Sequence, residues 1–139
     1  MVAACCVMAI DLAEAADAEG LIEATKHGDL PAVQAALAAG ADPDAHDDVA
    51  NTALIFAARD GELEIARMLI DHGATVDWVD AEGVTPLILA SFKGHAALVR
   101  LLLDHGADTA IRDQWDRSAL DYALRRGEAD PIARMLRAR

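Results

Sequence analysis

The sequence predicts an all-α protein in which short helix-turn-helix units stack side by side into a solenoid. Two observations support this prediction. The helix-forming residues Ala, Leu, Glu, Asp and Arg dominate the chain, whereas aromatic residues make up only 4% of it. Several residue types also recur at one fixed interval of 33 residues, which is the signature of a repeat architecture.

The interval is shared by small, apolar and polar positions, so it does not reflect one residue type alone. The recurring sets are Gly28, Gly61, Gly94 and Gly127; Gly40, Gly73 and Gly106; Leu21, Leu54, Leu87 and Leu120; Ala24, Ala57, Ala90 and Ala123; and Thr52, Thr85 and Ser118. We therefore divide the chain into units at about 14–46, 47–79, 80–112 and 113–139. Residues 1–13 fall outside the period and are expected to form an N-terminal extension or helix.

Each unit carries the signals of two helices. Thr52, Thr85 and Ser118 are suited to cap the first helix at its N-terminus. Glycines 28, 61, 94 and 127 are expected to end that helix at positive φ. The second helix has an apolar stripe, ends before glycines 40, 73 and 106 and, in the last unit, begins at Pro131.

The third unit carries the most complete pattern. It reads Asp-Ala-Glu-Gly-Val-Thr-Pro-Leu over 80–87 and continues with Ala90, Gly94-His95, Leu98-Val99, Leu102-Leu103 and Gly106-Ala107-Asp108. This pattern resembles an ankyrin repeat, and 51–54 with Ala57, Gly61 and Gly73 resembles a second one. The resemblance covers about 14–139. It implies β-hairpin-like loops between the helix pairs and a non-catalytic protein that binds another protein.

One departure from the family pattern is regular. The histidine that usually follows Thr-Pro-Leu is replaced by Ile22, Ile55, Ile88 and Asp121. Since that histidine usually bonds a neighbouring loop, we expect a drier and less constrained base for the loops.

The formal net charge of −12 limits the classes of partner. Nucleic acids and anionic membranes are disfavoured, because binding phosphates requires positive surface. A basic protein partner would be attracted by the field of the chain. The alternative interpretation is that the acidity only keeps the protein soluble.

Candidate partner-binding residues are those that the family pattern places on the loop tips and the ends of the first helices. Aromatic and arginine side chains dominate binding energy at interfaces. The candidates are Trp78, Phe92, Arg112, Trp115, Arg117, Asp48, Arg59 and Arg125. The alternative for Trp78 and Trp115 is that each packs on a neighbouring loop and binds nothing. The charges also differ along the chain, since aspartates crowd 42–48 and arginines crowd 112–126.

We find no motif for catalysis and predict no cofactor. The stretch 42–48 is rich in aspartate, but Asp47 and Ala53 stand where a calcium loop needs glycine and glutamate. His72 and His105 are interpreted as caps at helix C-termini rather than metal ligands. The expected function is a protein-binding module, with an inhibitor or immunity-type protein against a basic enzyme or toxin as the alternative. A metal-binding or enzymatic protein is the least favoured interpretation.

The N-terminal residues fit more than one cellular location. Residues 1–10 are apolar but lack the positive segment of an export signal, so an additional helix or a truncated signal both fit. Cys5 and Cys6 are adjacent and do not suit an unstrained disulfide. No apolar run is long enough to span a membrane. We expect a monomer in the cytoplasm.

Overall fold

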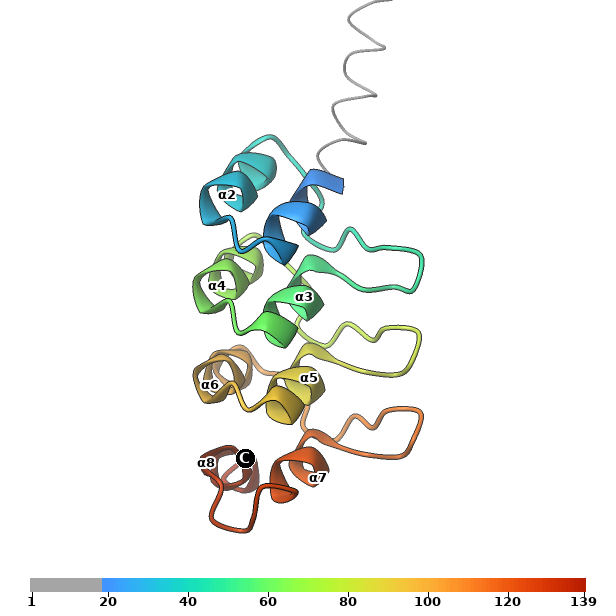
Figure 1. Cartoon of the computed structure of the whole chain (residues 1–139), viewed down its shortest axis with the longest axis vertical. Helices are drawn as coiled ribbons and strands as arrows, with labels where there is room; N and C mark the ends of the chain where they lie inside the picture. Colours follow the sequence, from blue (N-terminus) through green and yellow to red (C-terminus); the bar gives the residue numbers. More distant parts are fainter. Residues whose placement is uncertain (1–18) are drawn as a thin grey trace, which may run out of the picture.

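The computed structural model describes residues 19–139, and these form pairs of antiparallel helices stacked along one axis (Figure 1). Residues 19–26 are helical and pair with α2 (Leu30–Ala38). The next pairs are α3 (Ala53–Asp60) with α4 (Leu63–Asp71), α5 (Pro86–Lys93) with α6 (Ala96–Asp104), and α7 (Ala119–Leu124) with α8 (Pro131–Arg137). The predicted all-α helical solenoid is confirmed. The expected N-terminal extension at 1–13 lies outside the described residues, and the exact unit boundaries stay a prediction.

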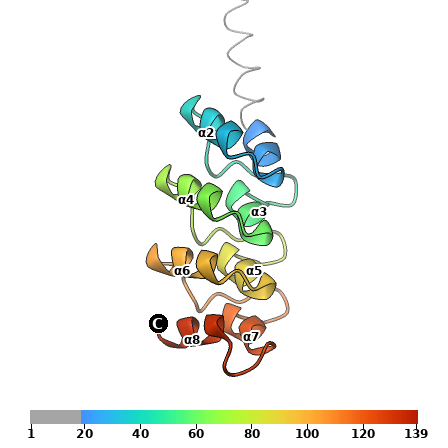
Figure 2. The same cartoon turned by 60° about the vertical axis from the view of Figure 1, so that its left-hand side comes forward.

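The molecule has three layers, which Figures 1 and 2 show from two sides. Helices 19–26, α3, α5 and α7 form an inner row, and α2, α4, α6 and α8 form an outer row. The loops between units project beside the inner row. We call these two rows the inner and outer helices. None of the described helices is long and apolar enough to cross a membrane.

One continuous core runs between the two rows of helices. Leu21, Leu54 and Leu87 are at most 1% exposed. Ala57, Ala90 and Ala123 are fully buried between the inner and outer helices, where a larger side chain would separate the backbones. Because a single helix pair cannot bury its apolar face, the stacking of neighbours stabilises each unit.

The predicted N-caps are confirmed. Thr52, Thr85 and Ser118 each accept a hydrogen bond from the backbone N–H three residues later, at 3.4, 3.2 and 3.3 Å. The histidine caps are confirmed as well. The Nδ1 atoms of His72 and His105 lie 2.8 and 2.9 Å from the carbonyl oxygens four residues earlier.

The predicted glycine at positive φ follows the first three inner helices, with φ 66° at Gly28 after helix 19–26, but the prediction fails for the last inner helix. Gly61 and Gly94 end α3 and α5 at φ 75° and 83°. Gly127 also has positive φ, but α7 already ends at Leu124 with Arg125 as its C-cap. In this unit Arg126 bonds the Phe92 carbonyl and the carboxylate of Asp130, which caps α8.

The loop tips are held by a repeated aspartate that the sequence analysis did not recognise. In Asp47, Asp80 and Asp113, Oδ1 accepts the backbone N–H groups two and four residues later, at 2.8 to 3.0 Å. Neighbouring tips are joined by backbone bonds, from Ala81 N–H to Val49 O and from Gln114 N–H to Glu82 O. Within 19–139 the β-pairing is limited to one isolated bridge, so the tips are hairpin-like turns rather than strands.

The expected dry loop base is present at Ile55 and Ile88, whereas the expected lower constraint stays a prediction. Ile55 and Ile88 are 2% exposed. The aspartate turns and the backbone bonds between neighbouring tips restrain the loop tips.

Candidate protein-binding site

A groove of about 360 Å³ lies between the inner helices α5 and α7 and the loop tips at 80–84 and 113–117. We call it the α5–α7 groove. Its lining residues are Glu82, Val84, Ile88, Leu89, Phe92, Trp115, Arg117, Tyr122 and Arg125. Most of these side chains are apolar or aromatic, which is typical of a site that receives a side chain from a binding partner.

Two aromatic side chains form the exposed walls of the groove. Phe92 on α5 is 47% exposed and Trp115 on the last loop tip is 51% exposed. Phe92 also packs edge-on against Tyr122 of α7, with ring centroids 5.4 Å apart. Exposed aromatic side chains are enriched at protein interfaces, and this chain has only 4% aromatic residues.

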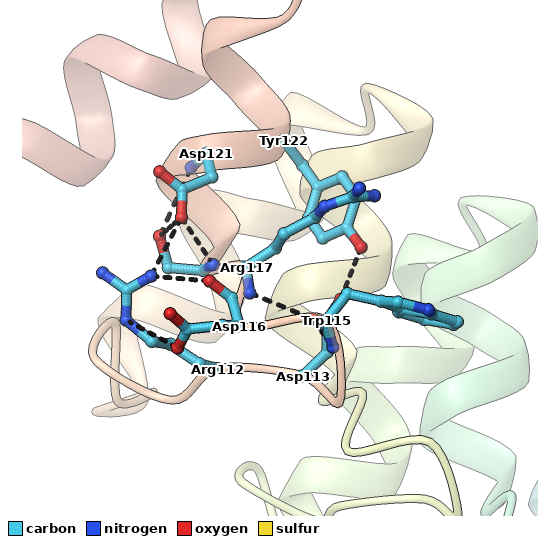
Figure 3. A network of polar contacts seen from close by, with 8 residues as sticks. Arg112, Asp113, Trp115, Asp116, Arg117, Asp121 and Tyr122 are labelled. Carbon is cyan, nitrogen blue, oxygen red and sulfur yellow. Dashed lines mark hydrogen bonds and ion pairs between the residues drawn. The ribbon is translucent and has the colours of Figure 1, made fainter.

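Tyr122 is fixed from below by Asp113, as Figure 3 shows. The buried carboxylate of Asp113 accepts the Tyr122 hydroxyl and the backbone N–H groups of Trp115 and Arg117. Burial alone would raise the pKa of Asp113, but these three hydrogen bonds and the nearby positive charge of Arg117 together hold the pKa below its ordinary value. Burial and the bond to Asp113 raise the pKa of Tyr122. One carboxylate thus orders both the tip and the tyrosine.

Two arginines stand over the Tyr122 ring at the rim of the groove. The guanidinium carbons of Arg125 and Arg117 lie 5.0 and 5.9 Å from the ring centroid, within the range of cation–π contacts. Within 19–139 neither arginine is joined to a carboxylate by an ion pair. Both guanidinium groups are therefore available to a partner.

The structure brings together four of the predicted site residues, namely Phe92, Trp115, Arg117 and Arg125. It places the other four elsewhere. Asp48 is exposed on the first loop tip, Arg59 pairs with Asp60 at 2.9 Å, and Arg112 pairs with Asp121 at 3.2 Å. The arginine bond lowers the pKa of Asp60 and the Ser118 backbone bond lowers that of Asp121.

Trp78 is half-buried and anchored within the loop layer. Its Nε1–H donates to the carbonyl of Ala50 at 2.8 Å, and its ring lies 5.0 Å from that of His46. This geometry agrees with the alternative interpretation, in which Trp78 packs on a neighbouring loop. A role in binding stays untested.

Five lining residues were not among the predicted site residues, namely Glu82, Val84, Ile88, Leu89 and Tyr122. The signal was present, because Phe56, Leu89 and Tyr122 occupy one position of the repeat and Arg59, Phe92 and Arg125 occupy another. Aligning the units would have shown that these two positions share the inner-helix face.

A second hollow of about 380 Å³ lies at the other end of the same face, lined by Glu19, Ile22, Glu23, Lys26, His46, Asp47 and Asp48. It is mainly acidic, so the two ends of the face differ in charge as the sequence suggested. Among the described residues there is no group of three or more His, Cys, Asp or Glu placed to hold a metal ion.

The family model described as ankyrin repeats (three copies) matches residues 21–113. The chain therefore belongs to the ankyrin-repeat family, whose members are typically non-catalytic modules for protein–protein interaction. No curated protein matches the chain in sequence. The match ends at residue 113, but α7 and α8 continue the same stacking, so the structure adds a fourth helix pair.

Proposed function

We propose that this protein binds a protein partner through the α5–α7 groove and catalyses no reaction. The supporting observation is that Phe92 and Trp115, both about half exposed, face the same groove as the unpaired Arg117 and Arg125. Aromatic and arginine side chains in a common pocket are the usual centre of binding energy at an interface. The remaining exposed residues of this face would surround that centre and exclude water.

Four helix pairs limit the size of the interface. We expect about 800 Å² to be buried on each partner, which is the standard size for a specific complex. We also propose that the protein itself is a monomer, with its terminal units covered by polar residues such as Arg134 and Arg137. Light scattering after gel filtration would contradict this proposal if the mass doubled at higher concentration.

The binding proposal is tested by quantitative capture of partners from cells of the source organism. The test variant is Phe92→Ala/Trp115→Ala, and the control is Val49→Ala/Arg100→Ala, which removes exposed side chains from the first tip and from α6. A protein retained by the wild type and the control but lost from the test variant supports the proposal. Equal retention by all three forms contradicts it, provided that circular dichroism shows the same helix content.

An inhibitor or immunity-type protein that neutralises a basic enzyme or toxin is the second candidate. The net charge of −12 and the acidic hollow around Asp48 favour it. Such an inhibitor would associate quickly at low ionic strength and much more slowly at high ionic strength. Stopped-flow association that does not change with salt would eliminate this candidate.

A further inference from the structure

We propose that the α5–α7 groove recognises a partner segment in which a large apolar side chain lies next to an aspartate or glutamate. The apolar side chain would fill the space between Phe92 and Trp115, and the carboxylate would pair with Arg117 and Arg125. This inference deepens the proposed function and rests on it, because it assigns a chemistry to the segment that the groove binds.

Arg117 and Arg125 lie at the rim of the groove without an ion pair to a carboxylate of 19–139. The chain holds 24 acidic residues against 12 basic ones, so carboxylates are abundant. Seven of the twelve lysines and arginines, all of which lie in 19–139, pair with a carboxylate, and Arg117 and Arg125 are among the five that do not. Arg117 and Arg125 both lie within cation–π distance of one tyrosine ring, and neither has an ion pair within 19–139. Such a site is complementary to a carboxylate supplied from outside.

The groove has few acidic side chains of its own. Glu82 is the single acidic side chain in the lining, against two guanidinium groups. Asp113 lies underneath, but it is 6% exposed and its oxygens are bonded to Tyr122 and two backbone N–H groups. Its oxygens therefore have partners of their own, although its charge also attracts Arg117 from beneath. The residues that line the groove carry two positive charges against one negative charge.

Hydrogen bonds hold Tyr122 and the loop tip around Trp115 in place before a partner binds. The Asp113–Tyr122 bond fixes the ring over which both guanidiniums stand. The aspartate turn fixes the backbone on both sides of Trp115. Because a preordered site loses less conformational entropy when it binds, these contacts favour recognition of a short segment.

The overall acidity of the chain does not oppose this assignment at contact distance. At physiological ionic strength, charges separated by more than about 8 Å are largely screened. The acidic first loop lies at the opposite end of the stack, whereas Arg117 and Arg125 would touch the ligand directly (Figure 1). The local charge of the groove therefore decides which segment binds.

The test is selection from a random-peptide phage library, followed by fluorescence polarisation with the selected peptides. We expect wild-type protein to enrich peptides that carry Asp or Glu within two residues of Leu, Phe, Met or Trp. Arg117→Glu/Arg125→Glu should weaken these peptides by at least about tenfold and select peptides with Lys or Arg at the same place. The matched control is Arg100→Glu/Arg134→Glu, which makes the same charge change on the outer helices and should leave binding unchanged.

The outcomes separate this inference from the proposed function. Peptides lost in Phe92→Ala/Trp115→Ala but unaffected by reversal of the two arginines would overturn the acidic specificity and leave the groove as the binding site. Peptides unaffected by either pair of substitutions would overturn both. An enriched set that is basic or uncharged, or the absence of any enriched peptide, also counts against the inference.

Discussion

Replacing Asp113 by alanine is expected to destabilise the last unit and disorder the groove. The substitution removes the acceptor for the backbone N–H groups of Trp115 and Arg117 and for the hydroxyl of Tyr122. The two backbone groups lie at an exposed tip, where water replaces the lost acceptor. The Tyr122 hydroxyl belongs to a side chain that is 7% exposed, so it would be left without a partner in a nearly dry place.

The magnitude follows from comparison with an equivalent aspartate. Asp80 makes the same two backbone bonds in the preceding tip, with no tyrosine among its hydrogen-bond donors. Asp80→Ala should therefore cost about 1–2 kcal/mol, because bonds to a charged group at the surface are only partly replaced by water. Asp113→Ala adds a buried, unsatisfied hydroxyl, which costs a further ~1–3 kcal/mol. The difference between the two variants isolates the tyrosine bond.

The measurement is urea unfolding followed by far-ultraviolet circular dichroism and by tryptophan fluorescence. Both probes are needed because a terminal repeat can unfold separately from its neighbours. Adding Tyr122→Phe to Asp113→Ala should recover part of the loss, since the orphaned hydroxyl is then absent. If Asp113→Ala proves no more destabilising than Asp80→Ala, the assigned role of the buried carboxylate is wrong.

Three further results are expected. Leu87→Ala should cost ~2–5 kcal/mol in thermal or urea unfolding, because the side chain is 1% exposed in the centre of the stack, and a smaller loss would show that the core collapses around the gap. Gly61→Ala should cost clearly more than Gly40→Ala in the same assay: both glycines have positive φ, but a Cβ at Gly61 would lie 2.8 Å from the His95 ring, whereas the space at Gly40 is open. The pKa of Asp113 lies below its ordinary value of about 3.9, so its contribution to stability is present above that pH and is lost as the pH falls through the folded-state pKa. The wild type should therefore lose more stability on acidification than Asp113→Ala does. Parallel profiles of stability against pH for the two proteins would contradict this.

The repeat made most of the fold predictable. The N-cap position recurs as Thr52, Thr85 and Ser118 because the first helix of each unit needs the same cap. The small position recurs as Ala57, Ala90 and Ala123 because the inner and outer helices pack closely in each unit. Prediction failed where one unit differs from the others. The early end of α7 coincides with a bond from Arg126 to the Phe92 carbonyl of the preceding unit, a contact between residues 34 positions apart that the repeat pattern does not indicate.

The binding groove was only partly predictable for a related reason. Composition and family position selected Phe92, Trp115, Arg117 and Arg125, but they equally selected Arg59 and Arg112, which are paired with nearby carboxylates. Whether an arginine is free depends on which side chains of neighbouring loops and helices come within 4 Å of it. A run of charged residues in the sequence does not show which carboxylates come within that distance of an arginine.

The amino-acid sequence by itself determined that this protein is an all-α stack of ankyrin units, because capping, helix termination and apolar periodicity are local properties repeated at a fixed interval. The tertiary structure decided which of the exposed residues act together. Phe92, Trp115, Arg117 and Arg125 come from α5, a loop tip and the end of α7, and they meet only because consecutive units stack. The availability of the two arginines also depends on how Asp113 and Tyr122 pack, which is a contact between a loop and a helix rather than a property of either segment.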